Sequence, residues 1–137
     1  MGDDAATHQL ADIWHDVFSN VRWGIAVASA DGATIVTVNK AFAAARGYTI
    51  DELVGMPALK LFAPSALAAL HEGLRTGNEP GGNHFRSVHV RKDGSTFPVE
   101  ILSSFICGPD GALRYRVGHV HDISAQRDTE DLLAAIV

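Results

Sequence analysis

Three Asp-Gly turns, each between two runs rich in β-branched and aromatic residues, constrain the fold of this chain most strongly. They lie at Asp31-Gly32, at Asp93-Gly94 and within residues 108–111. An Asp-Gly pair suits a tight hairpin turn, so the runs on either side pair as antiparallel strands. The first turn predicts a hairpin over residues 23–39. The other two predict a three-stranded meander over residues 84–123.

The first helix is predicted near the N-terminus by apolar residues that recur on one helical face. These residues are Leu10, Ile13, Trp14, Val17 and Phe18, and the helix should end near residues 19–20. Trp14 and Phe18 are large for one stripe. The helix therefore either packs on its own domain or forms a dimer contact through Leu10, Trp14, Val17 and Phe18.

Three further helices are predicted between the two groups of strands. Asn39 can cap a helix over residues 40–46 that ends at Gly47. Thr49 and Glu52 form a capping box for a short helix that ends at Gly55. Pro64 suits the first turn of a longer helix that carries Leu67, Leu70 and Leu74 and ends at Gly77.

The order of these elements predicts an α+β domain. We expect one five-stranded antiparallel sheet with short helices on one face and amphipathic helices at both ends. Residues 1–21 form a tail and first helix, residues 22–124 the domain, and residues 125–137 the start of a linker helix. Ser124 would cap that last helix, with its apolar side formed by Leu132, Leu133, Ile136 and Val137. The helix stops in mid-pattern, so we expect a longer protein with an output domain beyond it.

Composition excludes several classes of function. The 137 residues carry a net charge of −5 with lysines and arginines scattered singly, which disfavours direct nucleic-acid binding. Cys107 is the only cysteine, so an internal disulfide and a cysteine-based zinc site are excluded. The acidic N-terminus is unlike a signal peptide, and no apolar run approaches the ~20 residues that span a bilayer, so we expect a cytoplasmic protein without a membrane anchor. No recognised catalytic motif occurs, and we expect no enzyme activity.

Several segments together resemble the PAS domain family. They are "VASADGATIVTVNKAFAAARGYTIDELVGM", "HVRKDGSTFPVEI" and "VGHVHDIS", in the order and spacing of the family. The resemblance implies a sensor or interaction module, usually dimeric, of the kind found in two-component systems and transcription regulators. Such a module passes its signal through flanking helices to a kinase, cyclase, phosphatase or DNA-binding output. Because PAS domains share a fold and not one function, the pocket has to specify the function.

Two cofactor-binding subfamilies of PAS domains differ from this chain at their characteristic residues. The flavin-binding LOV type needs a cysteine where Ala58 stands, and polar flavin contacts where His89, Val99 and Val120 stand. Cys107 is interpreted instead as a small buried apolar residue. The haem-binding type has its axial histidine where Ala66 stands. His71 lies five residues later, at the margin of the apolar stripe of its helix, so it is a weak candidate for haem. We therefore expect no bound cofactor.

The inward face of the sheet, counted from the Asp-Gly turns, predicts a ligand cavity. Its predicted lining is Phe42, Leu61, Ser87, His89, Val99, Ile101, Ser103, Arg116, Gly118 and Val120. A buried Arg116 would need an anion, which predicts a small polar ligand that carries a carboxylate. The alternative is that Arg116 points out at a strand end and side chains fill the pocket.

The outward face of the last strand carries His119 and His121, two residues apart. Paired imidazoles can bind a metal, and the hairpin pairing places Glu100 across from His119, but no third ligand is evident. The alternative is a partner or pH-sensitive contact on that face.

The signal is expected to pass through Asp122, Ile123 and Ser124 into the last helix. Two alternative functions remain open. One is a ligand-free homodimerisation domain, and the other is a haem or flavin sensor.

Overall fold

The computed structural model describes residues 2–68 and 83–136. In these residues the N-terminal half contains α1 (Gly2–Asn20), β1 (Gly24–Ser29), β2 (Ile35–Val38), α2 (Lys40–Arg46), α3 (Ile50–Leu53) and the 3-10 helices η1 (Ala58–Leu61) and η2 (Pro64–Ala66). The C-terminal half contains β3 (Asn83–Val90), β4 (Thr96–Cys107), β5 (Leu113–Asp122) and α5 (Ser124–Ile136). The helix predicted from Pro64 includes Leu70, His71, Leu74 and Gly77, which lie outside the described residues.

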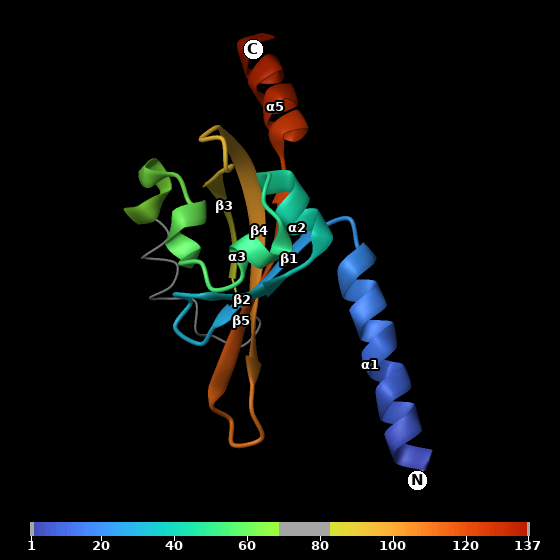
Figure 1. Cartoon of the computed structure of the whole chain (residues 1–137). Coiled ribbons are helices and arrows are strands. Elements are labelled where there is room, and N and C mark those ends of the chain that lie inside the picture. Colours follow the sequence, from blue (N-terminus) through green and yellow to red (C-terminus); the bar gives the residue numbers. More distant parts are fainter. Residues whose placement is uncertain (1, 69–82, 137) are drawn as a thin grey trace.

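The strands form one antiparallel sheet in the order β2-β1-β5-β4-β3. Both predicted hairpin groups are present, and β5 pairs with β1 in the middle of the sheet. The helices and 3-10 turns between β2 and β3 cover one face (Figure 1). The predicted α+β fold class is therefore confirmed.

The Asp-Gly turns are closed by their own side chains. The Asp31 carboxylate accepts hydrogen bonds from the Ser29 hydroxyl at 2.6 Å and from the Ala33 amide at 3.0 Å. Asp93 accepts in the same way from the hydroxyl and the amide of Ser95. Gly32 follows at φ +75°, a left-handed conformation that glycine adopts without a steric penalty. These local bonds fix the ends of the paired strands.

Asn39 joins the start of α2 to the first strand. Its side-chain oxygen accepts from the Phe42 amide at 3.0 Å, which caps the helix, and from the Ile25 amide at 2.9 Å. Its side-chain nitrogen donates to the Trp23 carbonyl at 2.9 Å. Gly24 lets the helix approach closely, since a Cβ there would lie 3.1 Å from the Cα of Phe42. The predicted capping box of Thr49 and Glu52 is also present.

The hydrophobic core lies between the sheet and the covering helices. Its buried members come from both layers and are Ile35, Val38, Phe42, Ala43, Leu53, Leu61, Phe97, Val99, Ile101 and Val120. Burying one such side chain contributes about 1.5–3 kcal/mol. Three residues of the predicted inward face, Val99, Ile101 and Val120, therefore form the sheet side of the core together with Ile35, Val38 and Phe97.

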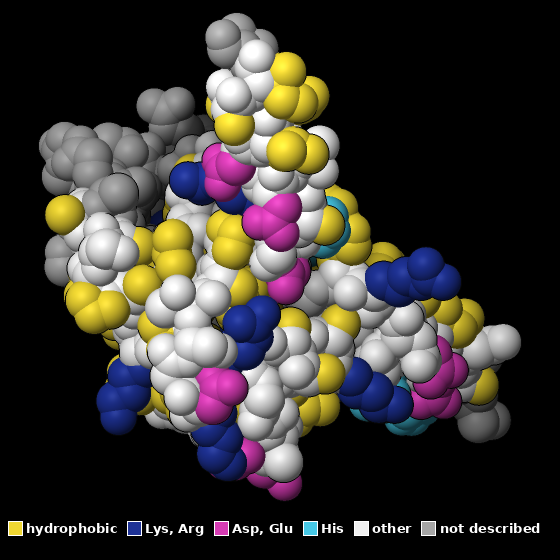
Figure 2. Space-filling view, turned by 90° about the horizontal axis from the view of Figure 1, so that it is seen from above, with side chains coloured by type: hydrophobic (Ala, Val, Ile, Leu, Met, Phe, Trp, Pro, Cys, Tyr) yellow, Lys and Arg dark blue, Asp and Glu magenta, His cyan; other side chains and the backbone are white. Residues whose placement is uncertain are grey.

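The two flanking helices project from this body in different directions (Figure 1). Each exposes an apolar stripe: Trp14 in α1 is 68% exposed and Ile136 in α5 is 73% exposed. Figure 2 shows hydrophobic side chains along one side of the projecting helix α5. No helix within residues 2–68 and 83–136 combines the length and apolarity needed to cross a membrane.

Two expectations about the last hairpin are wrong. Glu100 lies across from His121, and Leu102 lies across from His119, so the predicted pairing was displaced by two residues. The cause is the wider turn after Cys107 and an irregularity between Ile106 and Cys107. A shift of two leaves every side chain on its predicted face, because strand side chains alternate with period two. Cys107 is exposed and not buried, since it lies where β4 leaves the sheet for this turn.

Candidate functional site

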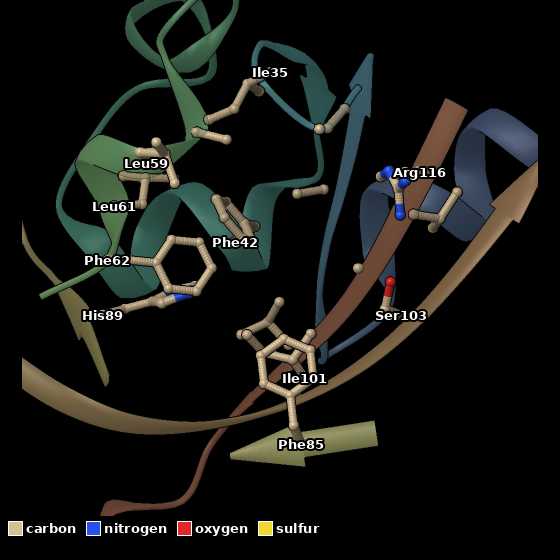
Figure 3. A pocket seen from close by; sticks show the side chains of 17 residues that line it. Ile35, Phe42, Leu59, Leu61, Phe62, Phe85, His89, Ile101, Ser103 and Arg116 are labelled. Atoms are coloured by element: carbon tan, nitrogen blue, oxygen red, sulfur yellow. The ribbon is translucent and has the colours of Figure 1, made fainter. Parts of the chain in front are cut away.

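A cavity of about 130 Å³ lies between the inward face of the sheet and the covering helices (Figure 3). The predicted residues that line it are Phe42, Leu61, His89, Ile101, Ser103, Arg116, Gly118 and Val120. The other lining residues are Ala26, Ala28, Gly32, Ile35, Ala58, Leu59, Phe62, Phe85 and Val117. The wall is therefore mainly apolar.

Two predicted lining residues lie outside this cavity. Val99 is fully buried and packs in the hydrophobic core. Ser87, which pairs with Val99 across β3 and β4, is half-buried and does not reach the cavity wall. Both residues share the inward face, as predicted, but core side chains occupy the space in front of Val99. The strand pattern assigns a face and cannot assign the boundary between packed core and open space.

One end of the cavity carries Arg116 from β5 and Ser103 from β4 (Figure 3). Arg116 is half-buried, and its Nε donates to the Ala30 carbonyl at 2.9 Å. This bond orients the guanidinium beside the end of β1. Arg116 thus lines the cavity, as the ligand hypothesis predicted, and its Nε is also bonded to protein backbone near the end of a strand, as in the alternative.

The other end of the cavity carries His89 from β3, in a T-shaped contact with the Phe62 ring (Figure 3). The Nδ1 atom of His89 accepts from Arg46, at 3.2 Å from Nε and 2.7 Å from Nη2. Both side chains are nearly inaccessible, with Arg46 1% and His89 2% exposed. The guanidinium also donates to the Phe42 carbonyl at 3.1 Å and lies 3.6 Å from the Phe42 ring centroid.

Electrostatics keep this buried pair in one protonation state. Burial, and secondarily the charge of Arg46, hold the pKa of His89 well below its usual value. Burial lowers the pKa of Arg46 to about 9, while the nearby charge of Asp122 raises this pKa and that of Arg91 lowers it. Arg46 is therefore charged and His89 neutral near pH 7. Since guanidinium only donates, the imidazole proton has to lie on Nε2.

The Nε2 atom of His89 is buried and has no hydrogen-bond partner among the described residues. A buried donor without a partner costs about 1–3 kcal/mol. Sequence reasoning placed His89 in the cavity but missed Arg46. A signal was present, because Phe42 and Arg46 are four residues apart and so share one helical face.

The lining differs from what the flavin and haem groups of the related subfamilies require. The cavity is smaller than the ~300–1,000 Å³ of typical drug-sized ligand pockets. Ala58 contributes a methyl group where a reactive thiol is needed, and Cys107 is exposed and outside the lining. The described residues therefore do not fit a reactive flavin site. Ala66 cannot ligate haem iron, and His71 lies outside the described residues.

The outward face of the sheet is occupied by ring and ion-pair contacts. His121 stacks on Trp23 with ring centroids 4.5 Å apart and planes 5° apart. Glu100 pairs with His84 at 2.6 Å. His119 is half-buried, and its Nδ1 has no partner among the described residues. In the same ranges no three His, Cys, Asp or Glu side chains gather in a group that could hold a metal.

The predicted relay residues form a fixed junction between β5 and α5. Asp122 accepts from the Ser124 amide at 2.9 Å and the Ser124 hydroxyl at 2.6 Å, which starts the helix. Ile123 is buried and its amide donates to the Pro98 carbonyl of β4. Further along α5, Glu130 accepts two hydrogen bonds from Arg86 of β3, at 3.0 and 3.1 Å. Both the junction before α5 and the helix itself are therefore bonded to strands that line the cavity.

Solved structures with the same architecture are PAS domains. A PAS domain from Colwellia psychrerythraea has a TM-score of 0.78 and 20% identity, and the match covers 85% of this chain and 98% of that one. The PAS domain of an HTR-like protein from Haloarcula marismortui has a TM-score of 0.73 and 25% identity, with coverage of 88% and 98%.

The LOV domain of a blue-light activated histidine kinase from Erythrobacter litoralis is also similar. Its TM-score is 0.63 and its identity 24%, and the match covers 77% of this chain and 99% of that one. A family model described as "PAS domain" matches residues 24–125. The sheet order, the covering helices and this match agree, and the chain belongs to the PAS domain family.

Proposed function

We propose that this PAS domain senses a small molecule in the cavity and passes its occupancy through α5 to an output domain. The observation that carries the proposal is a mainly apolar cavity with a polar group at each end, Arg116 with Ser103 at one and His89 at the other. An apolar wall with a few placed polar groups is typical of ligand pockets. A volume near 130 Å³ suits a molecule of about benzene size. Arg116 favours a carboxylate at its end.

The route to the output is the junction of β5 and α5. Val120 lines the cavity, and two residues later Asp122 caps α5. Displacement of Val120 by a ligand would move Asp122 on the same strand and so change the start of the helix. The related Erythrobacter domain belongs to a histidine kinase, and we propose an output of this signalling kind here.

A second candidate function is ligand-free homodimerisation. It is favoured by exposed apolar residues in the flanking helices, namely Leu10, Ile13, Trp14 and Val17 in α1 and Leu132, Leu133 and Ile136 in α5. Such stripes are unusual on a helix that stays in water. Sensing and dimerisation are compatible, because the cavity and the stripes are separate.

A thermal-shift screen of small carboxylic acids tests the sensor proposal. A true ligand raises the melting temperature and is then titrated by calorimetry. Arg116→Ala should weaken it by about 10-fold or more, because a charge-assisted hydrogen bond is worth roughly 1.5–3 kcal/mol. Arg114→Ala is the matched control: Arg114 is on the same strand, exposed and outside the lining. Equal affinity in both variants would refute the carboxylate site.

A size variant tests whether the ligand occupies the cavity. A Cβ at Gly118 would make ordinary contacts, 3.7 Å from Val120 and 4.0 Å from Ile101, so Gly118→Ala should fold. Its methyl group would enter the cavity and reduce ligand affinity. An unchanged affinity would place the ligand elsewhere. A visible absorption band in the purified protein would instead favour the haem or flavin alternative.

A further inference from the structure

The Nε2 atom of His89, which has no hydrogen-bond partner in the described part of the chain, defines the chemistry of one end of the cavity. The ring is held from behind by two donor contacts of Arg46 to Nδ1, at 3.2 and 2.7 Å. Arg46 itself is fixed by the Phe42 carbonyl and by the Phe42 ring. The imidazole therefore cannot turn its Nδ1 toward the cavity without removing the acceptor of two donor groups, Nε and Nη2, of a buried guanidinium.

The tautomer follows from this contact. A guanidinium has five N–H donors and no acceptor, so Nδ1 has to accept with its lone pair. The proton of the neutral ring is then on Nε2, which is buried and has no partner within residues 2–68 and 83–136. His89 lines the cavity, and in Figure 3 its ring lies at the end opposite Arg116. Among the described residues, His89 is thus a lining residue whose Nε2–H is buried and unpaired, in a part of the wall that also contains Phe62, Leu61 and Phe42.

Building on the proposed function, we infer that the ligand presents an acceptor oxygen, such as a carbonyl, to the Nε2–H of His89. An amine cannot bind there in the same way. An ammonium group carries only donors, and it would face a donor N–H with the charge of Arg46 directly behind it. The Arg46–His89 pair therefore selects oxygen acceptors and rejects cations, independently of what Arg116 binds.

Three probes of nearly equal shape test this selection on the unmodified protein. They are cyclohexanone, which has an acceptor oxygen, methylenecyclohexane, which has no polar group, and cyclohexylammonium, which only donates. Binding is followed by NMR titration at pH 7.5. We expect cyclohexanone to bind about 3- to 10-fold more tightly than methylenecyclohexane, as for one net hydrogen bond, and cyclohexylammonium to bind most weakly.

Nitrogen NMR of the imidazole gives a second and independent readout. We expect a protonated Nε2 and an unprotonated Nδ1 in the free protein, and a shift of the Nε2–H signal when cyclohexanone binds. A proton on Nδ1, or on both nitrogens, would overturn the inference without any ligand.

Two variants separate the hydrogen bond from packing. His89→Phe keeps an aromatic ring but removes the donor, so the preference for cyclohexanone over methylenecyclohexane should disappear. Phe62→Leu keeps the donor and removes ring contacts, so affinity for both probes should fall while the preference remains. If His89→Phe does not fold, the three probes on the unmodified protein still show whether the cavity prefers an acceptor oxygen.

The outcomes distinguish a failure of this inference from a failure of the proposed sensor function. If cyclohexylammonium binds as tightly as cyclohexanone, the selection by His89 is wrong, although the cavity still binds ligands. If a carboxylic acid binds through Arg116 but none of the three probes does, the proposed function stands and this inference falls. If no compound of either set binds, the proposed sensor function fails as well.

Discussion

A neutral imidazole buried beside a guanidinium makes the stability of this domain depend on pH. The pKa of His89 in the folded state is lowered from its ordinary 6.5, so the unfolded chain binds the proton more readily. The stability that the neutral His89 ring contributes is complete above pH 6.5 and is lost progressively as the pH falls below that value. We predict that acidification lowers the free energy of unfolding more steeply in the natural chain than in His89→Gln. The difference between the two slopes should reach up to ~1.4 kcal/mol per pH unit.

Urea unfolding between pH 8 and pH 5 measures this difference. A glutamine at position 89 can still accept from Arg46 but does not titrate, so other groups contribute equally to both proteins. Parallel stability curves for the two proteins would show that His89 can be protonated in the folded state. That result would contradict the fixed neutral ring.

At the scale of elements, the start of α2 depends on one side chain that serves two backbone segments. Asn39 is buried and accepts from the amides of Phe42 and Ile25, so Asn39→Ala removes a cap and leaves a strand amide without its partner. We predict a loss of about 2–4 kcal/mol of stability in urea unfolding. Thr49→Ala removes only an exposed cap and should cost about 1 kcal/mol. Equal losses would mean that the contact to Ile25 contributes nothing.

The start of α5 depends on the Asp122 cap. Asp122→Ala removes the acceptor of the Ser124 amide and hydroxyl, and should increase hydrogen exchange in the first turn of α5 by about 5- to 10-fold, as for a cap worth ~1 kcal/mol. Asp122→Asn keeps an acceptor oxygen and removes the carboxylate charge, which is half-exposed and pairs with Arg91, so it should have little effect on exchange in this turn. Faster exchange in the asparagine variant would show that the charge, and not the cap, starts the helix.

The elements were predictable because their signals are local. Asp31, Asp93 and the caps at Asn39 and Thr49 act on residues within a few positions, and period-two alternation assigned the inward face. The pairing of Glu100 was wrong because register depends on how wide the last turn becomes. Arg46 was missed because its burial depends on His89, which is 43 residues away in the sequence. The spacing of Arg46 and Phe42 indicates a shared helical face, but no periodic pattern indicates a contact with a residue at that separation.

At the scale of the whole molecule, the two projecting helices expose apolar stripes on which a second copy of the chain can pack. We predict that the protein is a dimer and that Trp14→Glu converts it to a monomer, because the charge would be buried in an apolar contact formed with Leu10 and Val17. Light scattering measures the change, from twice the 14.6 kDa chain mass to that mass itself. Gln9→Glu adds the same charge on the polar side of α1 and should leave the dimer intact. A Trp14→Glu protein of unchanged mass would exclude α1 as the main interface and leave the apolar stripe of α5 as the next candidate.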